Sequence, residues 1–170
     1  FALALRLFVG GRVSGYPVDM GCFSAWSLRI ASTGPWGFYS PEYFCDYPPG
    51  YMLLLWPVGL LVQAIGYADS PLIRLIIKSI PLLCDMGGAL LIFLYAKKRV
   101  PTSAALLMAM LLLLNPAGIV GGAGWGQVDS LLALLLMLAA IDAMDLRWIR
   151  ALPLYAFAVL VKPQAMLFAP

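Results

Sequence analysis

Two short polar segments carry side chains that could take part in chemistry. DYPPGY at residues 46–51 contains Asp46. GAGWGQVDS at residues 122–130 contains Gln127 and Asp129. Both segments interrupt apolar runs in a chain of 170 residues that is 63% hydrophobic. Because ionisable groups beside hydrocarbon are costly and usually functional, the two segments indicate chemistry at one face of a lipid bilayer.

The composition places the remainder of the chain in the membrane. Soluble domains contain about a quarter charged residues, whereas this chain has 11% and a mean hydropathy of +0.93. We therefore expect an all-α, polytopic bundle of transmembrane helices. The chain begins and ends within apolar runs and has no signal-peptide cleavage pattern near Gly10, so we expect a piece of a longer multi-pass protein.

Charge and cysteine content exclude several classes of function. The net charge is +3, but the basic residues are scattered between apolar runs, so we expect no nucleic-acid partner. The chain has no histidine and three cysteines without CxxC spacing, which removes the usual zinc sites and histidine-based triads. Cys22 and Cys45 could form a disulfide if their loop faces an oxidising compartment.

Apolar length and the positions of Pro, Gly and charges predict how the chain crosses the bilayer. The predicted apolar segments are 1–11, 51–67, 72–96, 102–120, 130–145 and 151–170. Lysine and arginine are enriched in short cytoplasmic loops, so Lys97, Lys98 and Arg99, and then Arg147 and Arg150, should lie inside. Loops 12–71 and 121–129 then lie on the extracytoplasmic side.

The segment 51–67 is expected not to cross. A crossing there would break the parity that the basic loops require, and the segment is short and contains Pro57. We predict that it lies in the membrane interface, with Trp56 and Tyr67 as interfacial aromatics. The alternative is that 51–67 crosses and another segment does not.

A second interfacial helix is predicted at about 22–33. Phe23, Trp26 and Ile30 recur at helical spacing, while Ser24, Ser27 and Arg29 should point elsewhere. Asp19 would directly precede this helix, where it is either a helix cap or a functional carboxylate.

Several charged residues also have a purely structural explanation. Asp129 or Ser130 could cap the helix that follows, and residues 47–50 could be only an extended turn. Lys78 and Asp85 are seven residues apart and should share a helix face, so we expect a buried ion pair. Asp142 and Asp145 should be solvated at a helix end.

Taken in order, DYPPGY, WGQVDS and KPQ, together with the first-loop segment VDMGCFSAW, resemble the GT-C superfamily of membrane glycosyltransferases. The order and spacing are similar to the N-terminal module of prokaryotic mannosyltransferase-like members. The resemblance covers nearly the whole chain, and it also implies a non-crossing interfacial helix in the first outer loop. It implies a multi-pass protein of a prokaryotic plasma membrane with an extracytoplasmic active site.

The resemblance implies an inverting transfer of a mannose-like hexose from a polyprenyl-phosphate carrier to a glycan, lipid or protein acceptor. Asp19 matches the first-loop acid that acts as general base, which is the role that a carboxylate near an attacking hydroxyl can fill. Lys162 is favoured as the cation that holds the lipid phosphate. Asp129 positions the acceptor or the donor. The residues expected to bind substrate are Asp46, Tyr47, Arg74, Lys78, Trp125, Gln127, Lys162 and Gln164.

Two further possibilities concern metal binding and function. Asp19 and Asp129 could bind a divalent ion, but the sequence lacks a second acid two positions from Asp129, unlike oligosaccharyltransferase relatives, so no cofactor is firmly expected. The chain could also be a transporter or flippase with a relay through Lys78, Asp85 and Asp129, or a noncatalytic module that binds the lipid carrier.

Overall fold

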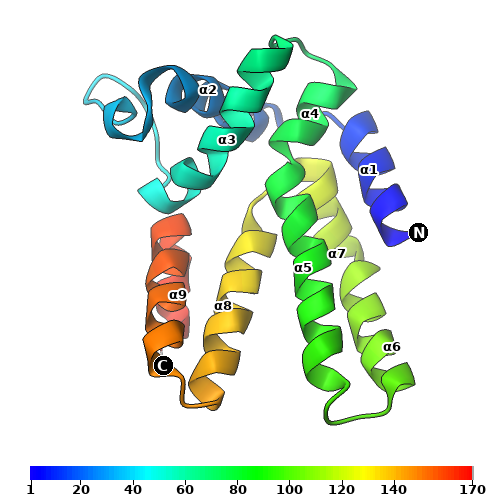
Figure 1. Ribbon diagram of the computed structural model, residues 1–170. Helices are drawn as coiled ribbons and strands as arrows, with labels where there is room; N and C mark the ends of the chain where they lie inside the picture. The colour runs from blue at the N-terminus through cyan, green and yellow to red at the C-terminus, as the bar shows by residue number, and fades with distance from the viewer. Residues whose placement is uncertain (170) are drawn as a thin grey trace.

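The computed structural model describes residues 1–169, and every regular element in them is helical, as the sequence predicted. Figure 1 shows their arrangement. The α-helices are α1 (Ala2–Arg12), α2 (Pro17–Thr33), α3 (Pro49–Ile65), α4 (Pro71–Ile77), α5 (Ser79–Ala96), α6 (Thr102–Leu113), α7 (Pro116–Gly118), α8 (Asp129–Met144) and α9 (Trp148–Val161). The shorter elements are the 3₁₀-helices η1 (Pro35–Gly37) and η3 (Pro163–Phe168) and the π-helix η2 (Ile119–Trp125).

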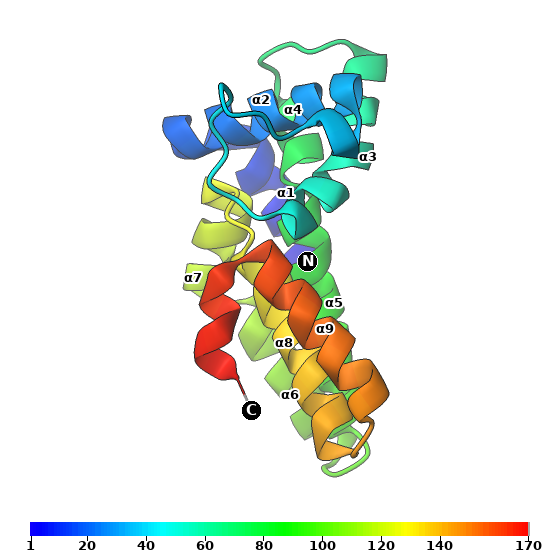
Figure 2. The ribbon, with the colours of Figure 1, turned by 90° about the vertical axis from the view of Figure 1, so that its left-hand side faces the viewer.

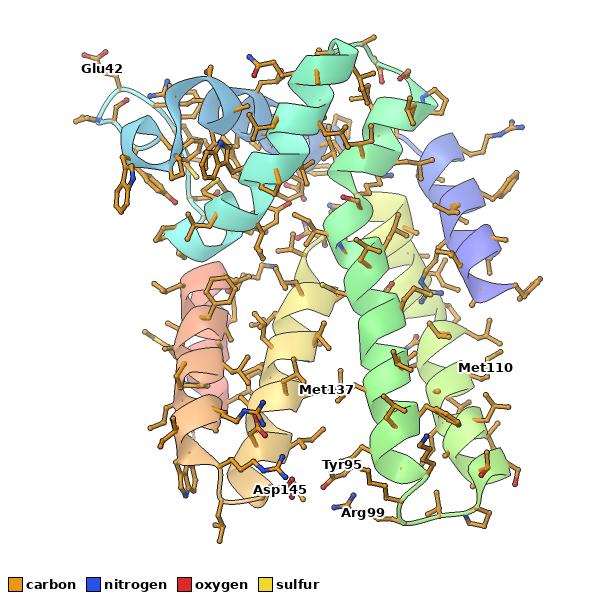
Figure 3. The ribbon with its side chains drawn as sticks, in the orientation of Figure 1. Glu42, Tyr95, Arg99, Met110, Met137 and Asp145 are labelled. Carbon is orange, nitrogen blue, oxygen red and sulfur yellow. The ribbon has the colours of Figure 1, made fainter. Side chains whose placement is uncertain are left out.

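The helices form two layers. Helices α5, α6, α8 and α9 run roughly alongside one another, while α2 and α3 pack together across one end of them (Figures 1 and 2). Glu42 lies near the end covered by α2 and α3, whereas Arg99 and Asp145 lie at the opposite end (Figure 3). The two basic loops, which follow α5 and α8, are thus at the same end of the bundle. The charges predict that these two loops face the same side of the membrane, and which side this end faces stays a prediction.

Helix length gives only part of the predicted membrane topology. Among the described residues, α5 is long and apolar enough to cross a membrane alone. Helix α6 and the helical stretch Pro116–Trp125 pass the same test as a pair, with a bend of 43° between them. Helices α3 and α9 are apolar but shorter. The multi-pass bundle and a non-crossing α3 therefore stay predictions.

Helix α2 begins earlier than predicted and is buried on more than one side. Phe23, Trp26 and Ile30 are at most 3% exposed, as their spacing predicted. The prediction that Ser24 and Ser27 point away from the core was wrong, since Ser27 is fully buried. Helix α3 packs on that side of α2, and each serine hydroxyl donates to a carbonyl of its own helix, so neither is left unpaired in the interior.

The predicted continuous helix 72–96 is broken at Lys78. Pro81 has no N–H to donate to the carbonyl of Ile77, which favours a break one turn before the proline. Lys78 has φ −79° and ψ 0° and joins α4 to α5. Its side chain therefore leaves the face on which Asp85 lies.

The expected outer loop 121–129 is largely helical. Asn115 is extended because Pro116 follows it, and its side chain accepts a hydrogen bond from the Ala117 N–H at 3.0 Å. The chain then re-enters a helix and widens into η2, which ends at Trp125. The segment predicted as 102–120 thus extends further, with a bend.

The last predicted segment, 151–170, is also interrupted. Helix α9 ends at Val161, and Lys162 is extended with φ −147° and ψ 124°. The residue before a proline avoids helical geometry, so Pro163 accounts for the break. The new element η3 begins at this proline and folds back beside α8 and α9.

The predicted ion pair between Lys78 and Asp85 was wrong. Asp85 instead accepts hydrogen bonds from Arg6 Nε at 2.9 Å and from Ser130 Oγ at 2.6 Å. Arg6 is fully buried. Asp142 and Asp145 do lie at the end of α8, where both come within 3.5 Å of Arg147 Nη1.

Lys78 is fully buried and bonded to backbone. Its three N–H donors are shared among the carbonyl oxygens of Gly10, Val13, Ala123 and Gly124, which lie 2.7–3.4 Å from Nζ. These carbonyls belong to the end of α1 and to η2, so the ammonium joins the segments that precede Asp19 and Gln127.

We expect Lys78→Met to lower the free energy of unfolding by about 1–3 kcal/mol, because it leaves buried carbonyls without a donor. Denaturant unfolding in detergent measures this change. Lys97→Met is the matched control, since Lys97 is exposed and its ammonium group makes no hydrogen bond or salt bridge within residues 1–169. Equal stability of the two variants would contradict a structural role for the Lys78 ammonium group.

Candidate functional site

Six residues predicted to act on substrate come from distant parts of the chain and lie in one network of contacts where α2, η2, α8 and α9 meet. They are Asp19, Tyr47, Trp125, Gln127, Asp129 and Lys162. The contacts that join them span up to 108 residues of sequence.

The Asp19 carboxylate is held by two N–H donors. Trp125 Nε1 donates to Asp19 Oδ2 at 2.6 Å, and Gln127 Nε2 donates to the same oxygen at 2.5 Å. None of the hydrogen bonds within residues 1–169 involves the other oxygen, Oδ1. The carboxylate is thus fixed in orientation, with one oxygen available to another group.

Asp19 does not cap its helix. Helix α2 begins at Pro17, its N-cap residue is Tyr16, and no side chain makes the capping hydrogen bond. Asp19 lies within the first turn, so the expectation that it directly precedes the helix was wrong. Its side chain instead crosses to the segment that follows η2.

The turn after η2 brings Trp125 and Gln127 to the same carboxylate. Gly126 has φ +92°, which a residue with a side chain adopts only with strain. A Cβ atom there would also lie 2.8 Å from the Met20 sulfur. The Gln127 N–H donates to the Gly121 carbonyl at 2.9 Å, which closes the turn. The glycine-rich sequence thus permits a tight turn at this point.

Tyr47 forms the aromatic side of the site. The centre of its ring lies 5.8 Å from the ring centre of Phe23, 5.5 Å from that of Trp26 and 5.3 Å from that of Tyr51. Its hydroxyl lies 3.5 Å from Gln127 Oε1 and donates to it. Burial raises the pKa of Tyr47, and the negative charges of Asp129, Asp19 and Asp46 raise it further. The hydroxyl therefore stays protonated at neutral pH.

Lys162 and Asp129 form an ion pair beside Tyr47. Lys162 Nζ lies 2.5 Å from Asp129 Oδ1, and the side chains are 15% and 67% exposed. The ammonium also lies 5.8 Å from the centre of the Tyr47 ring. Asp129 is the first residue of α8 but makes no capping hydrogen bond, and Ser130 bonds Asp85, so the capping explanation was wrong for both.

Within residues 1–169, no hydrogen bond, salt bridge or cation–π contact joins the other predicted substrate-binding residues to this network. Arg74 lies 3.7 Å from Asp69 and lines a separate cavity of about 220 Å³. Lys78 is enclosed by backbone carbonyls, so it is not available to a substrate phosphate. Gln164 is exposed on η3. Asp46 is also exposed, although its charge acts on Tyr47.

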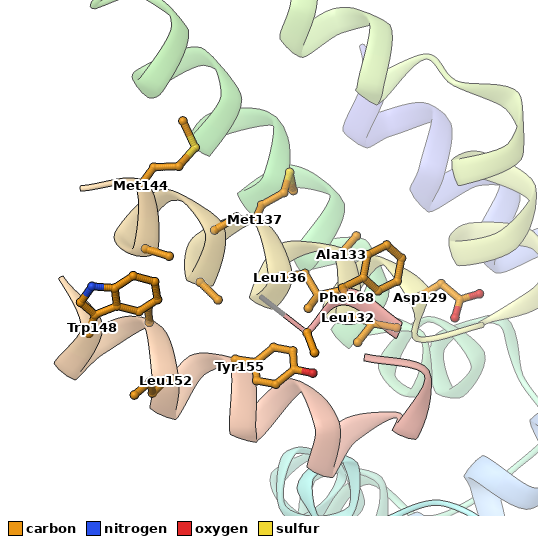
Figure 4. Close-up of a pocket in the computed structure, with 15 residues that line it drawn as sticks. Asp129, Leu132, Ala133, Leu136, Met137, Met144, Trp148, Leu152, Tyr155 and Phe168 are labelled. Carbon is orange, nitrogen blue, oxygen red and sulfur yellow. The ribbon is translucent and has the colours of Figure 1, made fainter. Parts of the chain in front are cut away.

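An apolar groove leads away from the ion pair. It has a volume of about 790 Å³ and lies along α8 and α9, with η3 on one side (Figure 4). Asp129 is the single charged residue among its described lining residues, and Leu136, Tyr155 and Phe168 line its middle. Trp148 and Met144 lie at the far end. This groove could not be predicted from the sequence, because it depends on how η3 folds back.

N–H groups surround the carboxylates of Asp19 and Asp129, and such donors bind an anion more readily than a metal ion. No group of three or more potential ligand side chains occurs within residues 1–169. Asp19 faces N–H groups and Asp129 faces an ammonium group, so a divalent cation would have to displace Lys162. Cys22 and Cys45, considered above as a disulfide, are both free thiols.

Comparison of the chain with protein-family models, with curated proteins and with solved structures found no match.

Proposed function

We propose that this chain is part of an inverting membrane glycosyltransferase that moves a hexose from a polyprenyl-phosphate carrier to an acceptor hydroxyl. The observation that carries the proposal is the position of Asp19. Its oriented carboxylate belongs to the same contact network as the Lys162–Asp129 ion pair, and that pair stands at one end of a long apolar groove. A base, a phosphate-binding cation and a site for a lipid chain are thus combined.

In the proposed reaction, Asp19 Oδ1 accepts the proton of the acceptor hydroxyl. The hydroxyl oxygen then attacks the anomeric carbon from the side opposite the phosphate, and the carbon–oxygen bond to the phosphate breaks. The products are a glycoside of inverted configuration and the free lipid phosphate. The hydrogen bonds from Trp125 and Gln127 to Oδ2 keep Oδ1 directed toward the acceptor.

Lys162 would bind the leaving phosphate. A lysine ammonium group has three N–H donors, and one of them is used by Asp129. The other two are free to bond phosphate oxygens, whose negative charge increases as the sugar leaves. Tyr47 adds an aromatic surface beside the same cation, while its hydroxyl proton is directed to Gln127 Oε1.

The groove suits the polyprenyl chain. Apart from Asp129, its described lining is made of apolar and aromatic side chains, and the charged residue is at the end nearest Lys162. A lipid with its phosphate at Lys162 would therefore extend along α8 and α9 toward Trp148. The exposed leucines of α5, α6 and α9, such as Leu90, Leu107 and Leu152, support a lipid environment for the bundle.

The transporter alternative has less support. A relay through Lys78, Asp85 and Asp129 requires contact between them, but each of these residues has a different partner.

The noncatalytic alternative shares the groove and Lys162 with the proposed enzyme and differs only in needing no base. A transfer assay in nanodiscs, with a panel of polyprenyl-phosphate sugars, separates the catalytic from the noncatalytic function. Release of lipid phosphate upon acceptor glycosylation supports catalysis, and carrier binding without release from any donor supports the noncatalytic function.

We expect Lys162→Ala to weaken binding of the polyprenyl-phosphate carrier by about tenfold, because a charge-assisted hydrogen bond is lost. Lys162→Arg retains the charge and should bind more tightly than the alanine variant. Binding of a fluorescent carrier in nanodiscs measures both.

Arg74→Gln is the control for this experiment, since it removes a cation that lines a different cavity. If Lys162→Ala binds as tightly as the wild type while Arg74→Gln binds more weakly, the phosphate is held by Arg74, and the role assigned to Lys162 is wrong.

A further inference from the structure

Two further cavities lie next to each other at the opposite end of the bundle from Asp19. One cavity, of about 410 Å³, is lined mainly by apolar residues of α5, α6 and α8, including Met108 and Met137. The other, of about 370 Å³, lies toward the loops that follow α5 and α8. The two share Leu91, Tyr95, Arg99 and Ile141, so they are parts of one space between the helices.

The two parts of this space differ in charge. The cavity near the loops is lined by three cationic side chains, Lys98, Arg99 and Arg147, and by one carboxylate, Asp145. Arg147 is already within 3.5 Å of Asp142 and Asp145. Neither Lys98 nor Arg99 makes a salt bridge within residues 1–169, so a positive charge remains beside an apolar cavity.

Tyr95 stands where the two parts meet. Its hydroxyl oxygen is buried and has no hydrogen-bond partner among the described residues. The guanidinium group of Arg99 lies 3.8 Å from the centre of its ring and donates to the Tyr95 carbonyl at 3.3 Å. Figure 3 shows Tyr95 and Arg99 near the end of α5 on the side toward α8. A buried polar group without a partner costs stability and commonly marks a site for an absent group.

We propose that this space binds an anionic phospholipid. Its phosphate contacts Lys98, Arg99 and the Tyr95 hydroxyl, and one acyl chain enters the apolar cavity toward Met108 and Met137. Basic pockets between helices on the cytoplasmic side are suited to acidic lipid head groups. The adjoining apolar cavity identifies a lipid, because a free phosphate ion would leave it empty. This binding requires neither the sugar donor nor Asp19.

Native mass spectrometry of the purified protein in detergent tests the proposal, with phosphatidylglycerol and phosphatidylcholine of identical acyl chains as probes. The wild type should bind phosphatidylglycerol more tightly. Arg99→Gln and Lys98→Gln should each lower that affinity about fivefold, which is the effect of one basic residue near an anionic lipid. Lys97→Gln is the matched control, because Lys97 is adjacent in sequence but lines neither cavity.

Tyr95→Phe provides a readout that a purely structural role would not give. Removing the unpaired hydroxyl should raise the melting temperature of the lipid-free protein by about 2–4 °C, while lowering the affinity for phosphatidylglycerol. This variant keeps the ring on which Arg99 stacks. It therefore also tests the site if a charge variant fails to fold.

Three results would overturn the proposal. The first is equal affinity of the wild type for the two lipids, and the second is an equal loss of affinity in Lys97→Gln and Arg99→Gln, which would indicate diffuse attraction. The third is displacement of phosphatidylglycerol by millimolar inorganic phosphate, which would indicate a site for the free ion instead of a lipid.

Discussion

Replacing Asp19 with asparagine is expected to lower the rate of sugar transfer by about 10² or more while the protein stays folded. Asparagine has nearly the same shape, and its amide oxygen can accept the hydrogen bonds that Trp125 and Gln127 donate to Oδ2. Its NH₂ group then takes the position of Oδ1. The acceptor hydroxyl meets a donor in place of a base, and its proton has no carboxylate to receive it.

The measurement is release of lipid phosphate in nanodiscs, with carrier binding measured in parallel. Glu42→Gln is the control, because Glu42 is an exposed acid of the same predicted outer loop and has no hydrogen bond or salt bridge to the site residues within residues 1–169. Carrier binding should be unchanged in both variants. Near-normal turnover of Asp19→Asn would remove Asp19 from the mechanism even if the chain is a glycosyltransferase.

The second large effect is expected from the buried pair of Arg6 and Asp85. Asp85→Leu should lower the free energy of unfolding by about 3–5 kcal/mol, because it leaves the Arg6 charge buried without a carboxylate. Arg6 is fully buried, and one of its terminal nitrogens already has no partner among the described residues. Denaturant unfolding of the detergent-solubilised protein measures the loss.

The double variant Arg6→Met with Asp85→Leu separates charge from packing. Replacing a buried ion pair with apolar residues of similar size is often neutral or stabilising, so the double variant should recover most of the stability. If it is as unstable as Asp85→Leu alone, the loss comes from packing around α1 and α5. Arg6→Lys is a further comparison, since lysine cannot bond both Asp85 and the Leu113 carbonyl with a planar group.

Local sequence patterns predicted the helical class and the buried face of α2 well. The spacing of apolar residues along one helix predicts which of its faces is buried. Phe23, Trp26 and Ile30 have this spacing and are buried. The site residues Asp19, Trp125, Gln127 and Lys162 could be chosen because polar groups are few in an apolar chain and because the sequence motifs around them resemble those of a known superfamily. Their mutual contacts are an outcome of the three-dimensional arrangement.

These local patterns could not predict which side chains pair across long separations in the sequence. Lys78 and Asp85 share a face only if the helix is continuous, and the break at Lys78 turns the lysine toward η2. Asp85 then meets Arg6, which is 79 residues away. A sequence signal for Arg6 did exist, since it is a charge within the apolar run that precedes Arg12, but its partner could not be identified from spacing.

The same limit applies to Ser24 and Ser27. Their polarity favoured an exposed side of α2, yet α3 covers that side because small residues let the two helices approach closely. A serine hydroxyl that bonds within its own helix is readily buried. Helical periodicity therefore identified one buried face of α2 and missed the other.

Because η2 is a π-helix, the number of residues between Pro116 and Gln127 determines how Trp125 and Gln127 reach Asp19. A π-helix closes its hydrogen bonds over five residues where an α-helix uses four. Deleting one residue there would permit an ordinary α-helical turn, and the indole of Trp125 would then point in another direction than Asp19. Apart from Trp125, Gly126 and Gln127, substitutions in this stretch should therefore be tolerated better than insertions or deletions. Among homologous sequences, a gap at this position should accompany loss or replacement of the first-loop acid.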